Sequence, residues 1–103
     1  MALIPEYFPD VESFEWDAGN LAKSEGKHAV FWTEAEQVFF NRPMVVAESS
    51  AAHGEQRHFA LGKTKAGRQL TIVFTIRDRR LRVISARPMS RRERRVYSDA
   101  QAQ

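Results

Sequence analysis

Residues 69–87, QLTIVFTIRDRRLRVISAR, decide the fold of this chain. They form two apolar runs, Gln69–Ile76 and Leu81–Arg87, which the polar stretch Arg77–Arg80 separates. Both runs are rich in β-branched residues, and apolar side chains recur at every second position. Two such runs joined by a short polar stretch predict an antiparallel hairpin.

Strict alternation assigns the side chains of each predicted strand to two faces. In the first strand, one face carries Leu70, Ile72, Phe74 and Ile76. In the second strand, one face carries Leu81, Val83, Ser85 and Arg87, and the other carries Arg82, Ile84 and Ala86. Ser85 and Arg87 are therefore expected to point the same way at the end of their strand.

A helix is expected directly after this hairpin. Ser90-Arg-Arg-Glu93 matches a capping box, in which serine and glutamate side chains satisfy each other's backbone amides. The helix should begin near Arg91 and run past Tyr97. Its positive N-terminus would lie beside Ser85 and Arg87, which is a favourable place for a phosphate group.

The upstream sequence predicts the rest of an α+β domain. Two more strands are expected at Met44–Glu48 and Gln56–Gly62, with a turn at Lys65–Gly67. Further upstream we expect a short strand at Ser13–Trp16, a helix capped by Asp17 that ends near His28, and a second helix opened by the capping box Thr33–Glu36. The prediction is a single domain over residues 1–103, with residues 1–12 irregular. It contains a small antiparallel meander sheet, with N-terminal helices and a C-terminal helix packed on one face.

Composition excludes several classes of protein. The chain has no cysteine, so it has neither disulfides nor thiolate chemistry. Its three histidines are scattered without a nearby acidic cluster, so we expect no metal site and no cofactor. No apolar run is long enough to span a membrane, and the acidic N-terminus does not resemble a signal peptide. We therefore expect a soluble cytoplasmic protein.

Charge is divided unevenly along the chain. Residues 77–95 contain nine arginines and two acidic residues, whereas residues 1–55 contain ten acidic residues and three basic ones. A basic face of this kind suggests a polyanionic partner, with phosphate as the natural candidate.

Each candidate residue also has a purely structural interpretation. Arg87 could bind phosphate, or it could form an ion pair with a carboxylate such as Asp17 or Glu93. His28, at a predicted helix end, could transfer protons at neutral pH or could simply cap the helix. The arginines after Ser90 could contact nucleic acid or an acidic partner, or could form a solvated surface.

Several short motifs occur in a characteristic order between residues 14 and 97. They are Phe14-Glu-Trp16-Asp17, Lys27-His28-x-Val30, Glu34-Ala35, Gly54-Glu-x-Arg57, Ala60-Leu-Gly62-x-Thr64, Gly67-Arg68-x-Leu70, Val83-Ile-Ser-Ala-Arg87, Arg92-Glu93-Arg94 and Tyr97. Their order and spacing resemble the BrnT toxin family. Two positions depart from the family pattern: Ala29 stands where glycine is common, and Ser24 stands where asparagine is common.

The resemblance implies a type II toxin that cleaves RNA without a metal, with a fold related to the RelE-like ribonucleases. It also implies a BrnA-like antitoxin, through which alone the complex would contact operator DNA. On this hypothesis the RNA 2′-hydroxyl is the nucleophile. The expected catalytic residues are His28, Arg57, Ser85 and Arg87. The expected RNA-binding residues are Lys27, Arg68, Arg77, Arg91 and Arg92. Whether Arg57 shares a sheet face with Ser85 and Arg87 depends on strand register, which the sequence leaves open. The alternatives are a non-catalytic nucleic-acid-binding module and a protein-interaction module that uses the same arginines.

Overall fold

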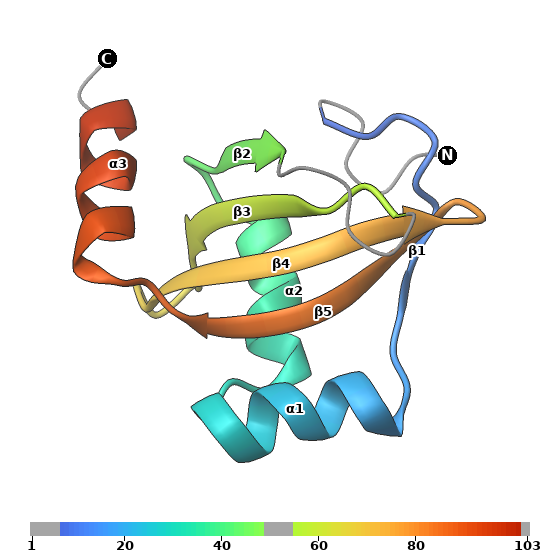
Figure 1. The fold of residues 1–103 in the computed structure, drawn as a ribbon. Helices are drawn as coiled ribbons and strands as arrows, with labels where there is room; N and C mark the ends of the chain where they lie inside the picture. The colour runs from blue at the N-terminus through green and yellow to red at the C-terminus, as the bar shows by residue number, and fades with distance from the viewer. Residues whose placement is uncertain (1–6, 49–54, 102–103) are drawn as a thin grey trace.

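A computed structural model describes residues 7–48 and 55–101. The described chain contains five strands and three helices, labelled in Figure 1. In order they are β1 (Ser13–Glu15), α1 (Ala18–His28), α2 (Trp32–Phe40), β2 (Val45–Glu48), β3 (His58–Lys63), β4 (Gln69–Arg77), β5 (Arg80–Pro88) and α3 (Arg91–Gln101). The predicted α+β class is confirmed.

The five strands form one sheet in the order β1-β5-β4-β3-β2. Strands β2 to β5 are the predicted antiparallel meander. The prediction of a wholly antiparallel sheet is wrong, because β1 pairs in parallel with β5, with Phe14 opposite Leu81. β1 thus lies at the edge of the sheet although it comes first in the chain. Its residue Phe14 packs against the aromatic ring of Phe39 in the core.

A β-bulge in β5 corrects the predicted alternation of that strand. Val73 pairs with Ser85, but the next residue of β4, Phe74, pairs with Val83. Ile84 is therefore an extra residue, and the alternation of side chains between the two faces of the sheet shifts by one position across it. The face that points into the core carries Leu81, Val83 and Ala86, and the opposite face carries Arg82, Ser85 and Arg87.

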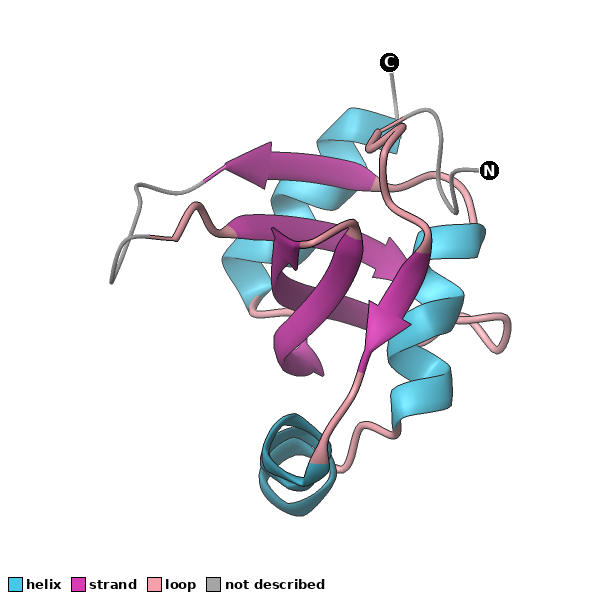
Figure 2. Ribbon diagram, turned by 90° about the vertical axis from the view of Figure 1, so that its right-hand side faces the viewer, coloured by secondary structure: helices cyan, strands magenta, loops and turns pink. Residues whose placement is uncertain are grey.

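The first two helices contact different parts of the sheet: α2 packs on one face, and α1 lies along the edge at β5. Helix α2 lies behind the sheet in Figure 1, and its buried residues Ala35, Val38 and Phe39 form the predicted apolar face. Helix α1 runs below β5 and is seen end-on at the bottom of Figure 2. The side-chain amide of Asn20 in α1 donates to the carbonyl of Val83 at 2.9 Å, which satisfies a backbone group on the outer edge of β5.

Helix α3 packs on the sheet face opposite to α2, which corrects the prediction that all helices cover one face. Its buried residue Tyr97 contacts Leu61 and Met89 in a small second apolar cluster. Leu61 alternates with Ala60, which points into the main core, so this cluster lies on the other side of the sheet. The Tyr97 hydroxyl donates to the carbonyl of Pro43 at 2.7 Å and anchors the helix.

Two of the three predicted helix caps are confirmed. Asp17 accepts from the amide of Asn20 at 3.0 Å, and the Ser90 hydroxyl accepts from the amide of Glu93 at 3.2 Å. The predicted box at Thr33–Glu36 is wrong, because the N-cap of α2 is Phe31, two residues before Thr33. Glu34 accepts from the amide of Phe31 instead, and the Glu36 carboxylate accepts from the indole N–H of Trp16.

Candidate functional site

The sheet face opposite to α2, called the open face below, carries most of the predicted catalytic residues. Strand register arranges its side chains in cross-strand rows. One row contains Leu61, Thr71 and Arg87, and the next contains Phe59, Val73 and Ser85. A third row contains Thr75 and Arg82, with Arg57 directly before β3. Register therefore places Ser85 and Arg87 on the same face, and alternation from Phe59 places Arg57 there as well, which the sequence alone left open.

These residues form two groups on the open face. Arg57 and Arg82 are separated by one strand, which corresponds to about 10 Å across the sheet. Ser85 lies one row further along, at a backbone distance of about 7 Å from the row of Arg82, and Arg87 lies two rows along, at about 13 Å. The two groups can therefore contact different parts of an extended polyanion.

Arg87 forms a two-point ion pair with Glu93, the third residue of α3. Nη1 donates to Oε1 at 2.6 Å, and Nη2 donates to Oε2 at 2.8 Å. The pKa of Glu93 is lowered from 4.5 to about 2, chiefly by the hydrogen bonds from Arg87 and also by the hydrogen bond from the Ser90 amide. Arg87 therefore forms the ion pair that its structural interpretation predicts, and its partner is Glu93.

The acidic N-terminal residues neutralise arginines from the C-terminal half. Arg82 pairs with Asp17 at 2.8 Å and with Glu15 at 3.6 Å, and its hydrogen bond lowers the pKa of Asp17. Three further pairs join acids to basic residues later in the chain: Arg79 with Glu12, Arg77 with Glu55 and Arg68 with Glu34. The division of charge in the sequence is therefore partly compensated in the fold.

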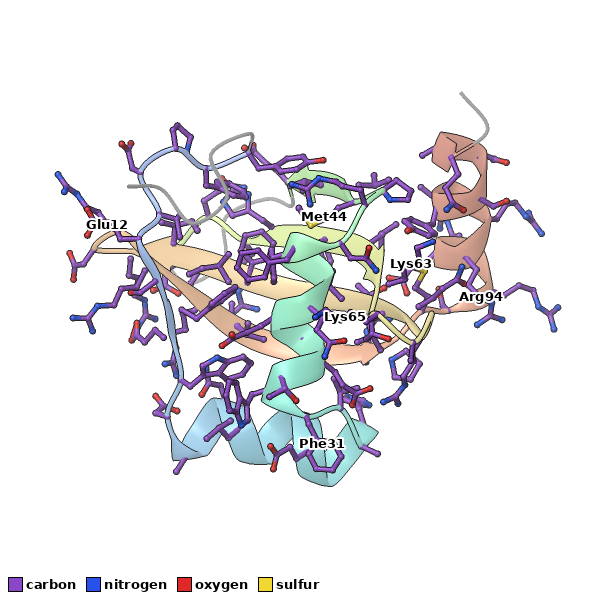
Figure 3. The ribbon with its side chains drawn as sticks, turned by 180° about the vertical axis from the view of Figure 1, so that it is seen from behind. Glu12, Phe31, Met44, Lys63, Lys65 and Arg94 are labelled. Carbon is purple, nitrogen blue, oxygen red and sulfur yellow. The ribbon has the colours of Figure 1, made fainter. Side chains whose placement is uncertain are left out.

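The arginines of α3 differ from this pattern. Arg91, Arg92, Arg94 and Arg95 are exposed, and within the described residues none of them pairs with a carboxylate. Arg94 donates to the backbone carbonyl of Met89 at 2.8 Å. Figure 3 shows Arg94 at one end of the molecule and Glu12 at the other. Uncompensated positive charge is thus concentrated on α3.

His28 is the last residue of α1, at the end of the molecule where β5 also ends (Figure 1). Arg68 joins these segments, because its guanidinium donates to the carbonyls of Ala29 at 3.0 Å and His28 at 3.5 Å. The neighbouring residue Gln69 accepts a hydrogen bond from the amide of Met89, just beyond β5. The His28 backbone therefore lies at the same end as Arg87, although α1 borders the sheet edge and Arg87 lies on the open face.

The backbone conformation of Ala29 shows why glycine would suit this position. Its φ angle is 53°, in the left-handed region where glycine is unstrained and a residue with a Cβ is not. A glycine at this position would end α1 without strain. The Ala29 carbonyl nevertheless accepts from Arg68, so the turn after His28 is held in place.

The remaining candidates occupy separate places. Arg77 lies at the end of β4 distant from α3, and Arg91 and Arg92 begin α3. The side chain of Lys27 and all of His53 lie outside the described part of the chain. His58 is buried between the rings of Phe8 and Phe74, which removes it from consideration as a surface site.

Sequence reasoning missed Arg82, which the bulge at Ile84 places on the open face with Ser85 and Arg87. No local sequence signal marks this bulge. Among the residues that the structure describes, no cluster of three potential metal ligands occurs. None of the described helices has the length and apolar character required to cross a bilayer.

Comparison with known proteins identifies one family. The sequence model described as "Ribonuclease toxin, BrnT, of type II toxin-antitoxin system" matches residues 16–93. This range begins directly after β1 and includes α1, α2, all of β2 to β5, and the start of α3 as far as Glu93. No curated protein matches the chain. Because the matched range covers well over half of its 103 residues, the chain belongs to the BrnT family of ribonuclease toxins from type II toxin–antitoxin systems.

Proposed function

We propose that this BrnT family member cleaves RNA by using the RNA 2′-hydroxyl as the nucleophile, without a metal ion. The observation that carries the proposal is the shared orientation of Arg57, Ser85 and Arg87 on the open face, in a chain whose family is a ribonuclease toxin. Charged donors that are fixed in advance on a rigid sheet can stabilise a phosphate whose negative charge increases during reaction.

In this reaction the 2′-oxygen forms a bond to phosphorus, and the bond from phosphorus to the 5′-oxygen breaks. One product ends in a 2′,3′-cyclic phosphate and the other begins with a 5′-hydroxyl. A proton leaves the 2′-hydroxyl, and another is donated to the departing oxygen. His28 is the proposed proton carrier, because imidazole changes charge near neutral pH.

Arg57 and Arg87 would stabilise the charge on the phosphoryl oxygens, and Ser85 would orient one of them. Lys27, Arg68, Arg77, Arg91 and Arg92 would hold the RNA backbone through salt-dependent contacts. Phosphate would have to compete with Glu93 for the guanidinium of Arg87, since both oxygens of that carboxylate are already engaged. An incoming phosphate could replace them because guanidinium binds both anions in a fork geometry.

The family also implies an antitoxin partner. We propose that this antitoxin is BrnA-like and that it alone brings the complex to operator DNA. A relation of the fold to RelE-like ribonucleases and a cytoplasmic location belong to the same proposal.

A labelled RNA incubated with the purified protein in excess chelator tests the activity. We expect cleavage that leaves a cyclic phosphate, and no cleavage at a position where a single 2′-deoxy nucleotide replaces the ribonucleotide. Binding without cleavage would instead support a non-catalytic nucleic-acid-binding module. Neither binding nor cleavage, together with normal bacterial growth on expression without the antitoxin, would support a protein-interaction module.

A further inference from the structure

A groove lies between α3 and the β2–β3 part of the open face. Its volume is about 620 Å³. The sheet contributes Val45, Ala47, Phe59 and Leu61, and α3 contributes Ser90, Arg92, Glu93 and Val96. The floor of the groove is therefore apolar, and its polar groups come from α3.

This groove is separate from the two groups of predicted catalytic residues but adjoins them. Phe59 belongs to the same row as Ser85, and Leu61 belongs to the same row as Arg87. Glu93 lines the groove and also binds Arg87. A partner in the groove would thus contact the carboxylate that holds a proposed catalytic arginine.

The surface of the groove is unusual for a region exposed to water. Val96 is 48% exposed on the α3 side, and Ala47 is exposed on the β2 side. Arg92 stands at the rim, and the other α3 arginines extend the positive charge along the helix without a carboxylate partner in the described chain. An apolar floor beside uncompensated arginines complements a segment with one apolar face and one acidic face.

We propose that this groove is the docking site of an acidic amphipathic helix of the antitoxin, which would neutralise the toxin by covering the open face beside Ser85 and Arg87. The inference rests on the proposed function for its biological meaning. The occupant is a protein segment and not RNA, because four of the five apolar lining residues are aliphatic and offer bases and phosphates neither hydrogen-bond donors nor a stacking surface. Its apolar residues would contact Val45, Leu61 and Val96, and its carboxylates would pair with Arg92 and its neighbours.

The test uses the full chain and its cognate antitoxin. The groove variant Ala47→Gln/Val96→Gln places two uncharged amides in the groove without altering any residue assigned to catalysis or RNA binding. The control is Phe40→Gln, because Phe40 is 56% exposed on α2, on the opposite side of the sheet. We expect the groove variant to bind the antitoxin at least about 30-fold more weakly, and the control to bind within about 2-fold of the unchanged chain.

RNA cleavage without antitoxin is measured on the same three proteins. Equal cleavage by all three, together with the selective loss of antitoxin binding, supports the groove. If none of them cleaves RNA but antitoxin binding still depends on the groove, the proposed activity fails and the docking site stands. Unchanged antitoxin affinity, or no antitoxin binding by the unchanged chain, overturns the docking site. A groove variant that loses RNA binding while retaining the antitoxin assigns the groove to RNA. A dimer of the unchanged chain that the groove variant disrupts assigns it to a second copy.

Discussion

The guanidinium of Arg87 and the carboxylate of Glu93 face each other through two parallel hydrogen bonds of 2.6 and 2.8 Å. This pair joins the end of β5 to the first turn of α3 across the two-residue connection Met89–Ser90. Glu93 therefore caps α3 through the Ser90 amide and binds the strand through Arg87. On the proposed function, a phosphate would have to replace this carboxylate at the guanidinium of Arg87.

Replacement of Glu93 by glutamine should make stability less dependent on acid pH. The folded-state pKa of Glu93 is about 2, below its ordinary 4.5, so its stabilisation is present above about pH 4.5 and is lost as the pH falls toward 2. We expect the free energy of unfolding of Glu93→Gln at pH 7 to be lower by about 1–2 kcal/mol. The loss is modest because the ion pair is partly exposed to solvent. Urea unfolding at pH 7, 4.5 and 3 should show this difference shrinking with acidity. The control Asp99→Asn removes an exposed carboxylate from the same helix, and an equal loss there would refute the role of the pair.

Arg87→Ala should reduce RNA cleavage by about 100- to 1,000-fold, as expected for loss of a donor to the reacting phosphate. The ion pair with Glu93 is lost in the same variant, so Glu93→Gln is the matched control. We expect Glu93→Gln to retain or increase cleavage, because Arg87 remains and its competitor has lost its charge. Initial rates at constant ionic strength provide the measurement. Equal losses in both variants would show that Arg87 acts only by anchoring α3.

Ala29→Gly should stabilise the fold by about 0.5–1 kcal/mol. The φ angle of 53° strains any residue with a Cβ, whereas glycine adopts it freely. A matched exchange is available within α1, where Gly26 is exposed and a Cβ there would meet no atom within 4 Å. Gly26→Ala should also stabilise, because alanine favours a helix interior. Urea midpoints that fall for Ala29→Gly would contradict the left-handed geometry of this turn.

Gly62→Ala should destabilise the protein by about 1–3 kcal/mol. A Cβ at this buried position would lie 2.8 Å from Cγ1 of Val38 in α2, so α2 could not pack as closely on β3. The double variant Gly62→Ala/Val38→Ala removes the clash. We expect it to be more stable than the sum of the two single effects implies. Additive effects on the urea midpoint would show that α2 simply moves away.

Sequence patterns predicted the elements that depend on neighbours in the chain. The β4–β5 hairpin and the caps at Asp17 and Ser90 each follow from a few consecutive residues. Sequence failed where distant segments decide the structure. β1 has only three residues, and its partner β5 lies some 65 residues further along, so nothing local indicates a parallel pair.

The candidate site was predictable in composition but not in arrangement. The identities of Ser85 and Arg87, and their common orientation, follow from alternation at the end of a strand. Arg82 joined them only through the extra residue Ile84, since a bulge changes the side chains of a strand from one face to the other. Ion pairs such as Arg82 with Asp17 could not be predicted because many acids could have served.

His28→Ala should reduce RNA cleavage by about 100- to 10,000-fold while leaving the fold intact. The side chain of His28 is partly exposed at the end of α1, and the hydrogen bond from Arg68 is accepted by the backbone carbonyl of His28. We therefore expect the substitution to change the free energy of unfolding by no more than about 0.5 kcal/mol. The pH profile of cleavage separates a proton-transfer role of His28 from a role in RNA positioning. If His28 transfers a proton, cleavage by the unchanged chain should depend on the charge state of one titrating group, and cleavage by the variant should lack that dependence. Matched RNA-binding measurements should show little difference between the two proteins. A His28→Ala protein that cleaves as fast as the unchanged chain would remove histidine from the mechanism and leave the arginines of the open face as its principal agents.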